Sequence, residues 1–156
     1  MTSARYSADP MNEVIRRAEI ADANQLSELE AAARHHLIEQ RGGAALLAEQ
    51  PAVGEWVSAI EDHARWIGVA ELDGFVVGFL ELAVTGDIAV VRQVYVQPEA
   101  RELGFGDGLL DAARQEAIRH GCSALEGFAL PGDRETKNLY ERAGITARKI
   151  IVSTRL

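Results

Sequence analysis

Two glycines close to an arginine mark the stretch of this sequence with the clearest capacity for chemistry. The stretch reads Arg101-Glu102-Leu103-Gly104-Phe105-Gly106-Asp107. Glycine has no Cβ, so the backbone at Gly104 and Gly106 can pass close to a ligand. The apolar residues that follow recur at helical spacing, at Leu109, Leu110, Ala113, Ala117 and Ile118. Free N–H groups and the helix dipole favour an anion at a helix start. The sequence therefore predicts a site for a phosphate-bearing ligand.

The elements that must position this loop can be read from hydrophobic spacing and turn residues. Strand formers lead up to Val96, and Pro98 ends that strand because proline has no N–H for a ladder. Strands are predicted at 14–20, 66–72, 75–84, 88–96, 123–130 and 145–155. Helices are predicted from Asp22 to Gly42, at 44–50 and 54–62, from the loop to His120, and from Asp133 to Arg142. The order β-α-α-β-β-β-α-β-α-β predicts an α/β fold with a sheet of mixed direction.

Size and composition predict one domain over residues 1–156, with residues 1–12 as a flexible tail. No apolar run approaches the roughly 20 residues of a membrane helix, and the start lacks the apolar stretch of a secretory signal. We therefore expect no membrane association. The single cysteine, Cys122, cannot form an internal disulfide, which fits a reducing cytoplasm; a small buried apolar residue is the plainer interpretation of it.

The net charge of −8 argues against general nucleic-acid binding. Its distribution is uneven: residues 1–86 hold 14 acidic and 6 basic side chains, whereas residues 87–156 hold 10 of each. One interpretation is that acidic helices are simply solvated. The other is that a cationic ligand approaches the first half while an anionic ligand binds the neutral second half.

Other patterns that could carry chemistry are weaker. His35 and His36, with Glu39 nearby, lack the His-x-x-x-His spacing of a zinc helix, so no metal site is predicted. The glycines at 104, 106 and 108 do not have the spacing of a dinucleotide fold, and no Lys-Ser/Thr pair follows them as in a nucleoside triphosphate loop.

Two motifs in sequence order give the chain a recognisable resemblance. Residues 101–106 fit Arg/Gln-x-x-Gly-x-Gly/Ala, preceded by Val-x-Val-x-Pro at 94–98, and residues 138–144 read Asn-Leu-Tyr-Glu-Arg-Ala-Gly. The chain thereby resembles the GNAT superfamily of N-acetyltransferases, from Ile67 onward in motifs and before that only in element type. The resemblance implies a mostly antiparallel central sheet flanked by helices, with acetyl-CoA as co-substrate and no metal.

The resemblance also implies roles for particular residues. The backbone N–H groups of 101–107 would hold the pyrophosphate of acetyl-CoA, and its pantetheine arm would pair with Val94, Tyr95 and Val96. An N–H on that strand would polarise the thioester carbonyl. Tyr140 matches the usual proton donor, although a core aromatic residue is the alternative interpretation. Asp133 stands where the family often has asparagine, and we group it with Asn138 among the CoA-binding residues.

A general base is harder to assign. Family members carry a glutamate at the position of Val90 or of Phe128, and neither is acidic here. Glu126 lies two residues from Phe128 and so shares its strand face. Glu81 has apolar neighbours on the third predicted strand, where it is either a base with a raised pKa or an exposed residue. A bound water is a further possibility.

These observations predict an N-acetyltransferase that moves an acetyl group from acetyl-CoA to a primary amine by direct attack in a ternary complex. The acidic first half favours a small cationic acceptor or a basic peptide. The alternative is an acyl-CoA-binding module of the same fold without catalysis, motivated by the missing carboxylates and by Asp133. Self-association as a homodimer, through a strand edge or an apolar helix face, is also conceivable.

Overall fold

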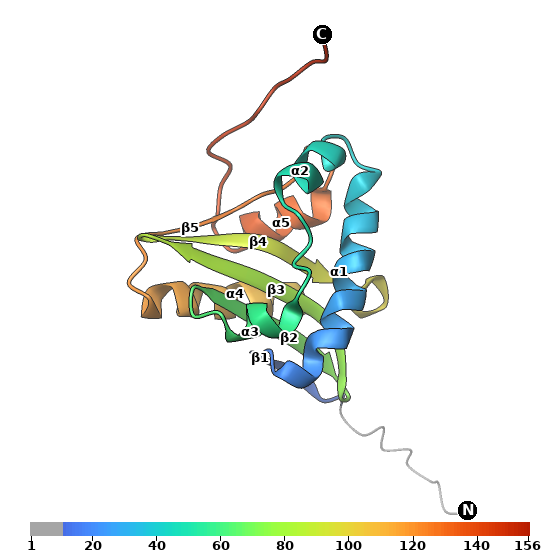
Figure 1. Ribbon diagram of the computed structural model, residues 1–156, viewed down its shortest axis with the longest axis vertical. Helices are drawn as coiled ribbons and strands as arrows, with labels where there is room; N and C mark the ends of the chain where they lie inside the picture. Colours follow the sequence, from blue (N-terminus) through green and yellow to red (C-terminus); the bar gives the residue numbers. More distant parts are fainter. Residues whose placement is uncertain (1–10) are drawn as a thin grey trace, which may run out of the picture.

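A computed structural model describes residues 11–156 of the chain (Figure 1). The flexible tail expected at 1–12 lies outside the described residues except for its last two. Of these, Asn12 exchanges two hydrogen bonds with Asp73, at N···Oδ1 2.9 Å and O···N 3.0 Å, so the described chain is tied to the sheet from its second residue. None of the helices over residues 11–156 is long and apolar enough to cross a membrane.

Five strands form one mixed sheet in the order β1-β2-β3-β4-β5. Their bounds are β1 Glu13–Arg17, β2 Arg65–Leu72, β3 Phe75–Thr85, β4 Ile88–Val96 and β5 Ala124–Gly127. The first four are antiparallel neighbours, and β5 alone runs parallel to β4. The expected mostly antiparallel α/β fold is confirmed.

Helices cover both faces of the sheet (Figure 1). They are α1 Ala23–Ile38, α2 Gly43–Glu49, α3 Trp56–Glu61, α4 Phe105–Arg119 and α5 Arg134–Arg142. Leu109, Leu110 and Ala113 of α4 are fully buried in one apolar cluster, which α5 shares through Leu139. On the other face, Leu26 of α1 packs with Phe79 of β3 in a second cluster. The spacing of apolar residues in the sequence thus produces two hydrophobic cores, one on each face of the sheet.

The predicted strand at 145–155 is wrong for this structure. Residues 146–156 form no strand, and every one of them is exposed. Ile145 donates its N–H to Tyr140 O, which completes the end of α5. A strand needs a partner for its backbone groups, and the described chain gives this segment none.

Candidate functional site

A gap opens in the sheet where β4 and β5 separate. β5 pairs with β4 only from Ile88↔Ala124 to Val91↔Gly127, whereas β3 follows β4 to Val96. A bulge lies at the same point, because Glu81 pairs with Gln93 while Leu82 pairs with Val91. Arg92 is therefore the extra residue on β4. Beyond the bulge, the backbone N–H and C=O groups on the β5 side of β4 do not pair with β5.

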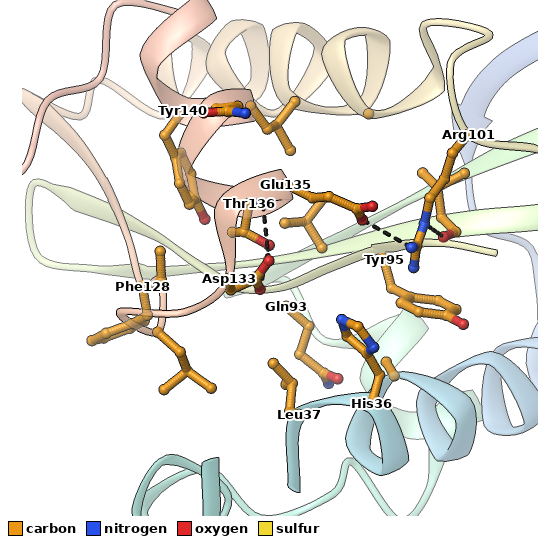
Figure 2. A pocket seen from close by; sticks show the side chains of 18 of the residues that line it. His36, Leu37, Gln93, Tyr95, Arg101, Phe128, Asp133, Glu135, Thr136 and Tyr140 are labelled. Atoms are coloured by element: carbon orange, nitrogen blue, oxygen red, sulfur yellow. Dashed lines mark hydrogen bonds and ion pairs between the residues drawn. The ribbon is translucent and has the colours of Figure 1, made fainter. Parts of the chain in front are cut away.

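The gap forms a cavity of about 990 Å³ (Figure 2). Most of the residues predicted to bind CoA or to react line it: Val94, Tyr95, Val96, Arg101, Glu102, Gly104, Phe105, Gly106, Asp107, Asp133, Asn138, Tyr140 and Glu81. Two of the predicted residues lie elsewhere. Leu103 packs against the core, and Glu126 is exposed on β5 outside the cavity lining. The opposite wall comes from α1 and α2, with His36 and Leu37 visible in Figure 2.

The glycine loop presents the start of α4 to this cavity. Gly104 is the N-cap with φ +83°, in the left-handed region that a side chain disfavours. A Cβ on Gly106 would approach Leu139 Cδ1 to 3.3 Å, so this glycine allows α5 to pack close to α4. The first N–H groups of α4 have no helical carbonyl to bond. Together with the helix dipole they favour an anion at this end of the cavity.

Arg101 extends from the loop toward Glu135 and Tyr95 at one side of the cavity (Figure 2). Its Nε donates to Val96 O at 2.9 Å, and its Nη1 forms an ion pair with Glu135 Oε2 at 2.8 Å. The guanidinium also stands over the ring of Tyr95, 5.7 Å from the ring centroid. The positive charge is thus fixed beside the helix start, and one partner is a carboxylate that an anionic ligand would have to replace.

Tyr140 reaches the point where the two strands separate. The residue is buried, at 7% exposure, and burial raises the pKa of its hydroxyl, helped by the nearby charge of Asp133 and opposed by a hydrogen bond with the backbone of Phe128. A Cβ on Gly127 would lie 2.2 Å from the Tyr140 hydroxyl. The hydroxyl therefore lies directly against the backbone of β5 at Gly127. Because its pKa is raised, the hydroxyl keeps its proton at neutral pH. Gly127 was not among the site residues predicted from the sequence.

Asp133 caps the start of α5 and is buried. Its Oδ1 accepts the N–H of Thr136 at 3.1 Å and its Oδ2 accepts the Thr136 hydroxyl at 2.7 Å. This capping satisfies the carboxylate and places its charge at a helix N-terminus, where negative charge is favoured. Asn138 lies one turn further along α5 and also lines the cavity.

A chain of hydrogen-bonded polar side chains joins three elements at the α1 side of the cavity. Glu81 of β3 is 3% exposed and accepts from Gln93 Nε2 at 2.9 Å. The same Nε2 donates to Glu30 Oε2 of α1 at 2.6 Å, and Glu30 also accepts the N–H of Val53. Arg65 Nη1 lies 3.5 Å from Glu81 Oε1. The two buried carboxylates thus share one amide donor, and of these three residues Glu81 and Gln93 line the cavity.

Neither Glu30 nor Gln93 was predicted as a site residue. One signal was available for Glu30, because it follows the buried Leu26 by four positions and so lies on the inner face of α1. In residues 11–156, no group of three His, Cys, Asp or Glu side chains is arranged to hold a metal ion.

The arrangement can hold a phosphate ester at the helix start and an extended arm along the free side of β4. At the end of that arm it offers a protonated phenol from one wall and a buried carboxylate from the other. This combination suits a transfer reaction that needs a proton donor and a proton acceptor.

Comparison with known proteins identifies the family of the chain. The sequence model of the Acetyltransferase (GNAT) family matches residues 24–145. A curated relative, the uncharacterized N-acetyltransferase YhfO of Bacillus subtilis (strain 168), is 32% identical over 91 residues, which cover 54% of this chain and 61% of the relative. The match thus spans less than two thirds of that relative's length.

Solved structures share the fold at low sequence identity. The aminoglycoside N-acetyltransferase AAC(6')-Iy, solved in complex with CoA, superposes with a TM-score of 0.71 at 14% identity, covering 92% of this chain and 98% of that one. A ribosomal-protein-alanine N-acetyltransferase from Brucella melitensis biovar Abortus 2308 gives 0.69 at 19% identity, covering 92% and 99%. The family match extends over most of the described chain. The chain therefore belongs to the GNAT family of acetyltransferases.

Proposed function

We propose that this chain is an acetyl-CoA-dependent N-acetyltransferase that acetylates a primary amine of a small cationic acceptor by direct attack in a ternary complex. The observation that carries the proposal is the single cavity wall that joins the glycine loop, the free side of β4 and Tyr140. Family membership supports the co-substrate. The cavity meets the need of such a reaction for one anion site and one open approach for the amine.

Each part of the wall has a role in this proposal. Acetyl-CoA supplies an activated acetyl thioester. The N–H groups of 101–107 hold its pyrophosphate, and Val94 to Val96 offer backbone partners to its pantetheine arm. An N–H of β4 near the bulge donates to the thioester carbonyl oxygen and favours the negative charge that develops there. Tyr140 donates its proton to the departing sulfur, which leaves more readily as a thiol.

Glu81 is the base in this proposal. Its carboxylate lines the cavity and is buried, and Gln93 fixes its orientation through the 2.9 Å hydrogen bond. It accepts the proton that the amine must lose, directly or through a water. Glu126 has no part in this assignment, because it is exposed on β5 outside the cavity lining.

The nature of the acceptor follows from charge. Glu81 of β3 lines the cavity, and its carboxylate, which also has Arg65 Nη1 at 3.5 Å, attracts an ammonium group. The structural neighbours named above are described as acting on an aminoglycoside and on a ribosomal protein, both of which offer amines. We therefore place polyamines, aminoglycoside-like compounds and basic peptides first among acceptors.

The test is release of the CoA thiol from acetyl-CoA across a panel of such amines, beside direct measurement of acetyl-CoA binding. We expect turnover with at least one cationic amine. Glu81→Gln should lower kcat/KM at neutral pH by about 10²-fold or more, the scale of a lost base. Glu126→Gln, which changes the same charge outside the cavity, is the matched control and should leave the rate unchanged. Binding without turnover on every amine would instead favour the non-catalytic acyl-CoA-binding module.

A further inference from the structure

Gln93 has one polar atom that the described protein leaves free. Its amide nitrogen Nε2 lies 2.9 Å from Glu81 Oε2 and 2.6 Å from Glu30 Oε2, so both of its hydrogens have acceptors. Within residues 11–156 the amide oxygen Oε1 makes no hydrogen bond, and it is not fully buried, unlike the unpaired Gln40 Oε1 and Trp56 Nε1. Because Gln93 is half-buried and lines the cavity, its free oxygen is open to a ligand there.

The two carboxylates decide which end of the amide is free. An ionised carboxylate only accepts hydrogen bonds, so it can contact the NH2 end of an amide but not the oxygen. Glu30 also accepts the N–H of Val53, and Glu81 has a positive charge close by, at Arg65 Nη1. Both contacts favour the ionised carboxylate. An amide turned over would set Oε1 against two carboxylate oxygens, so Gln93 presents its oxygen to the cavity.

The amide is held in this orientation before a ligand binds. Glu30 fixes it from the α1 side and is only 5% exposed, while Glu81 fixes it from β3 and is 3% exposed. Figure 2 shows Gln93 extending from β4 toward α1. An acceptor whose own position is locked by such partners costs little to organise when a ligand arrives.

We propose that Gln93 Oε1 accepts one N–H of the acceptor amine while Glu81 takes the other, so that the site selects primary amines. This inference rests on the function proposed above, in which Glu81 is the base. Oε1 and Nε2 are bonded to the same carbon, and Nε2 contacts Glu81, so one nitrogen can reach the oxygen and the carboxylate together. A neutral primary amine has two N–H groups and a lone pair. With both N–H groups held, its lone pair is left for the thioester.

The two N–H groups then have different fates. The nitrogen lone pair forms the bond to the thioester carbon, and the bond from that carbon to sulfur breaks. One proton passes from nitrogen to Glu81, and the departing sulfur takes a proton from Tyr140. The N–H held by Gln93 stays on nitrogen and becomes the N–H of the product amide. A secondary amine has a single N–H for the two acceptors, and its extra alkyl group would leave Oε1 unpaired, which a site of this kind discriminates against strongly.

The kinetic test compares agmatine, a cationic compound with one primary amine, with its N-methyl derivative in the thiol-release assay. For the unchanged chain, kcat/KM should favour agmatine by about 10²-fold or more. Gln93→Leu should narrow this ratio by about tenfold or more, whereas a merely structural role would slow both amines and leave the ratio alone. Glu30→Gln is the matched control. It disturbs the same buried chain, but the new side chain can still accept from Nε2, so the ratio should stay within about threefold.

Gln93→Lys keeps the test decisive if Gln93→Leu does not fold. An ammonium at this position still donates to both carboxylates but offers no acceptor, so it should slow both amines and narrow the ratio in the same way. An unchanged ratio in either folded variant would overturn the proposal.

A binding measurement separates failure of this inference from failure of the proposed function. A chain that releases no thiol with any amine contradicts the proposed function, and calorimetry on the CoA-loaded protein then decides the role of Gln93. Agmatine should bind about tenfold tighter than N,N-dimethylagmatine, whose ammonium has a single N–H, and Gln93→Leu should remove most of the difference. Equal affinities, or no measurable binding of agmatine, would refute the role of Gln93.

Discussion

Gly127→Ala tests the placement of Tyr140 without touching the tyrosine. On the backbone of Gly127, the added Cβ would lie 2.2 Å from the Tyr140 hydroxyl oxygen, 2.4 Å from Cζ and 2.8 Å from Cε1. Ordinary contacts of a Cβ begin near 3.4 Å. The outer half of the ring must therefore move by about 1 Å, and it cannot simply swing into water because Tyr140 is only 7% exposed.

The size of the effect follows from that displacement. A misplacement of about 1 Å of a reacting group lowers a rate by about 10²-fold. Loss of the proposed proton donor altogether, in Tyr140→Phe, should lower kcat by about 10²- to 10⁴-fold. Because both changes remove the same proton transfer, the double variant should be no slower than Tyr140→Phe alone. Overpacking should lower the free energy of unfolding by about 1–3 kcal/mol.

The assay is thiol release at saturating acetyl-CoA and amine, with acetyl-CoA affinity measured separately. Affinity should stay within about threefold, a difference below about 0.7 kcal/mol, because the glycine loop is untouched. Gly132→Ala is the matched control, since nothing lies within 4 Å of its added Cβ and its φ is not positive. It should keep the rate of the unchanged chain.

Two results would refute the reasoning. The first is a Gly127→Ala variant that is folded and has an unchanged kcat, which would mean that the position of the phenol does not matter. The second concerns pH. Because burial raises the pKa of Tyr140, its proton is retained, so kcat should not fall on the alkaline side up to about pH 10, the ordinary pKa of tyrosine. A loss of kcat well below that pH, absent in Tyr140→Phe, would contradict the assignment.

Three further changes probe the loop, the carboxylate pair and the fold. Glu135→Gln should tighten acetyl-CoA binding about two- to fivefold by freeing Arg101 from a partly exposed ion pair, as titration calorimetry can measure. Gln93→Leu removes the donor shared by two buried carboxylates, and should lower kcat/KM about tenfold and unfolding free energy by about 1–3 kcal/mol in urea melts. The hydrogen bonds from Arg16 lower the pKa of Asp22, so its charge stabilises the fold above the ordinary value of about 3.9 and this contribution is lost as pH falls through the lowered pKa. Asp22→Asn should therefore destabilise by about 1–2 kcal/mol at pH 7 and by progressively less below about pH 4 in acid melts.

Local features of the site could be predicted because they depend on neighbours in sequence. The left-handed N-cap at Gly104 and the start of α4 at Phe105 follow from a glycine placed before an apolar helical repeat. A helix was predicted to begin at Asp133, and the carboxylate of this residue accepts the N–H of Thr136 three residues on. In both places a few residues decide the backbone conformation.

The buried polar chain could not be predicted in the same way. Gln93 lies 12 residues from Glu81 and 63 from Glu30, and only the packing of α1 on the sheet brings them together. Spacing along one element shows which face a residue occupies, but not which residue of another element it meets. The error at 145–155 has a related cause. Strand propensity at Ile150 to Val152 is genuine, but pairing depends on an edge that propensity does not identify.

The cavity also changes what the uneven charge of the chain means. Within residues 11–86, Glu81 is the only carboxylate that lines the cavity, and Arg34 of α1 lines the opposite wall. Apart from the buried Asp22 and Glu30, the remaining acidic side chains act through solvent, where salt screens charges beyond about 8 Å at physiological ionic strength. The excess of −8 in the first half can therefore speed the approach of a cation at low salt, but it cannot select one acceptor over another. Selection between cationic amines must come from the charged groups that line the cavity, among them Glu81 of β3 and Arg92 of the bulge.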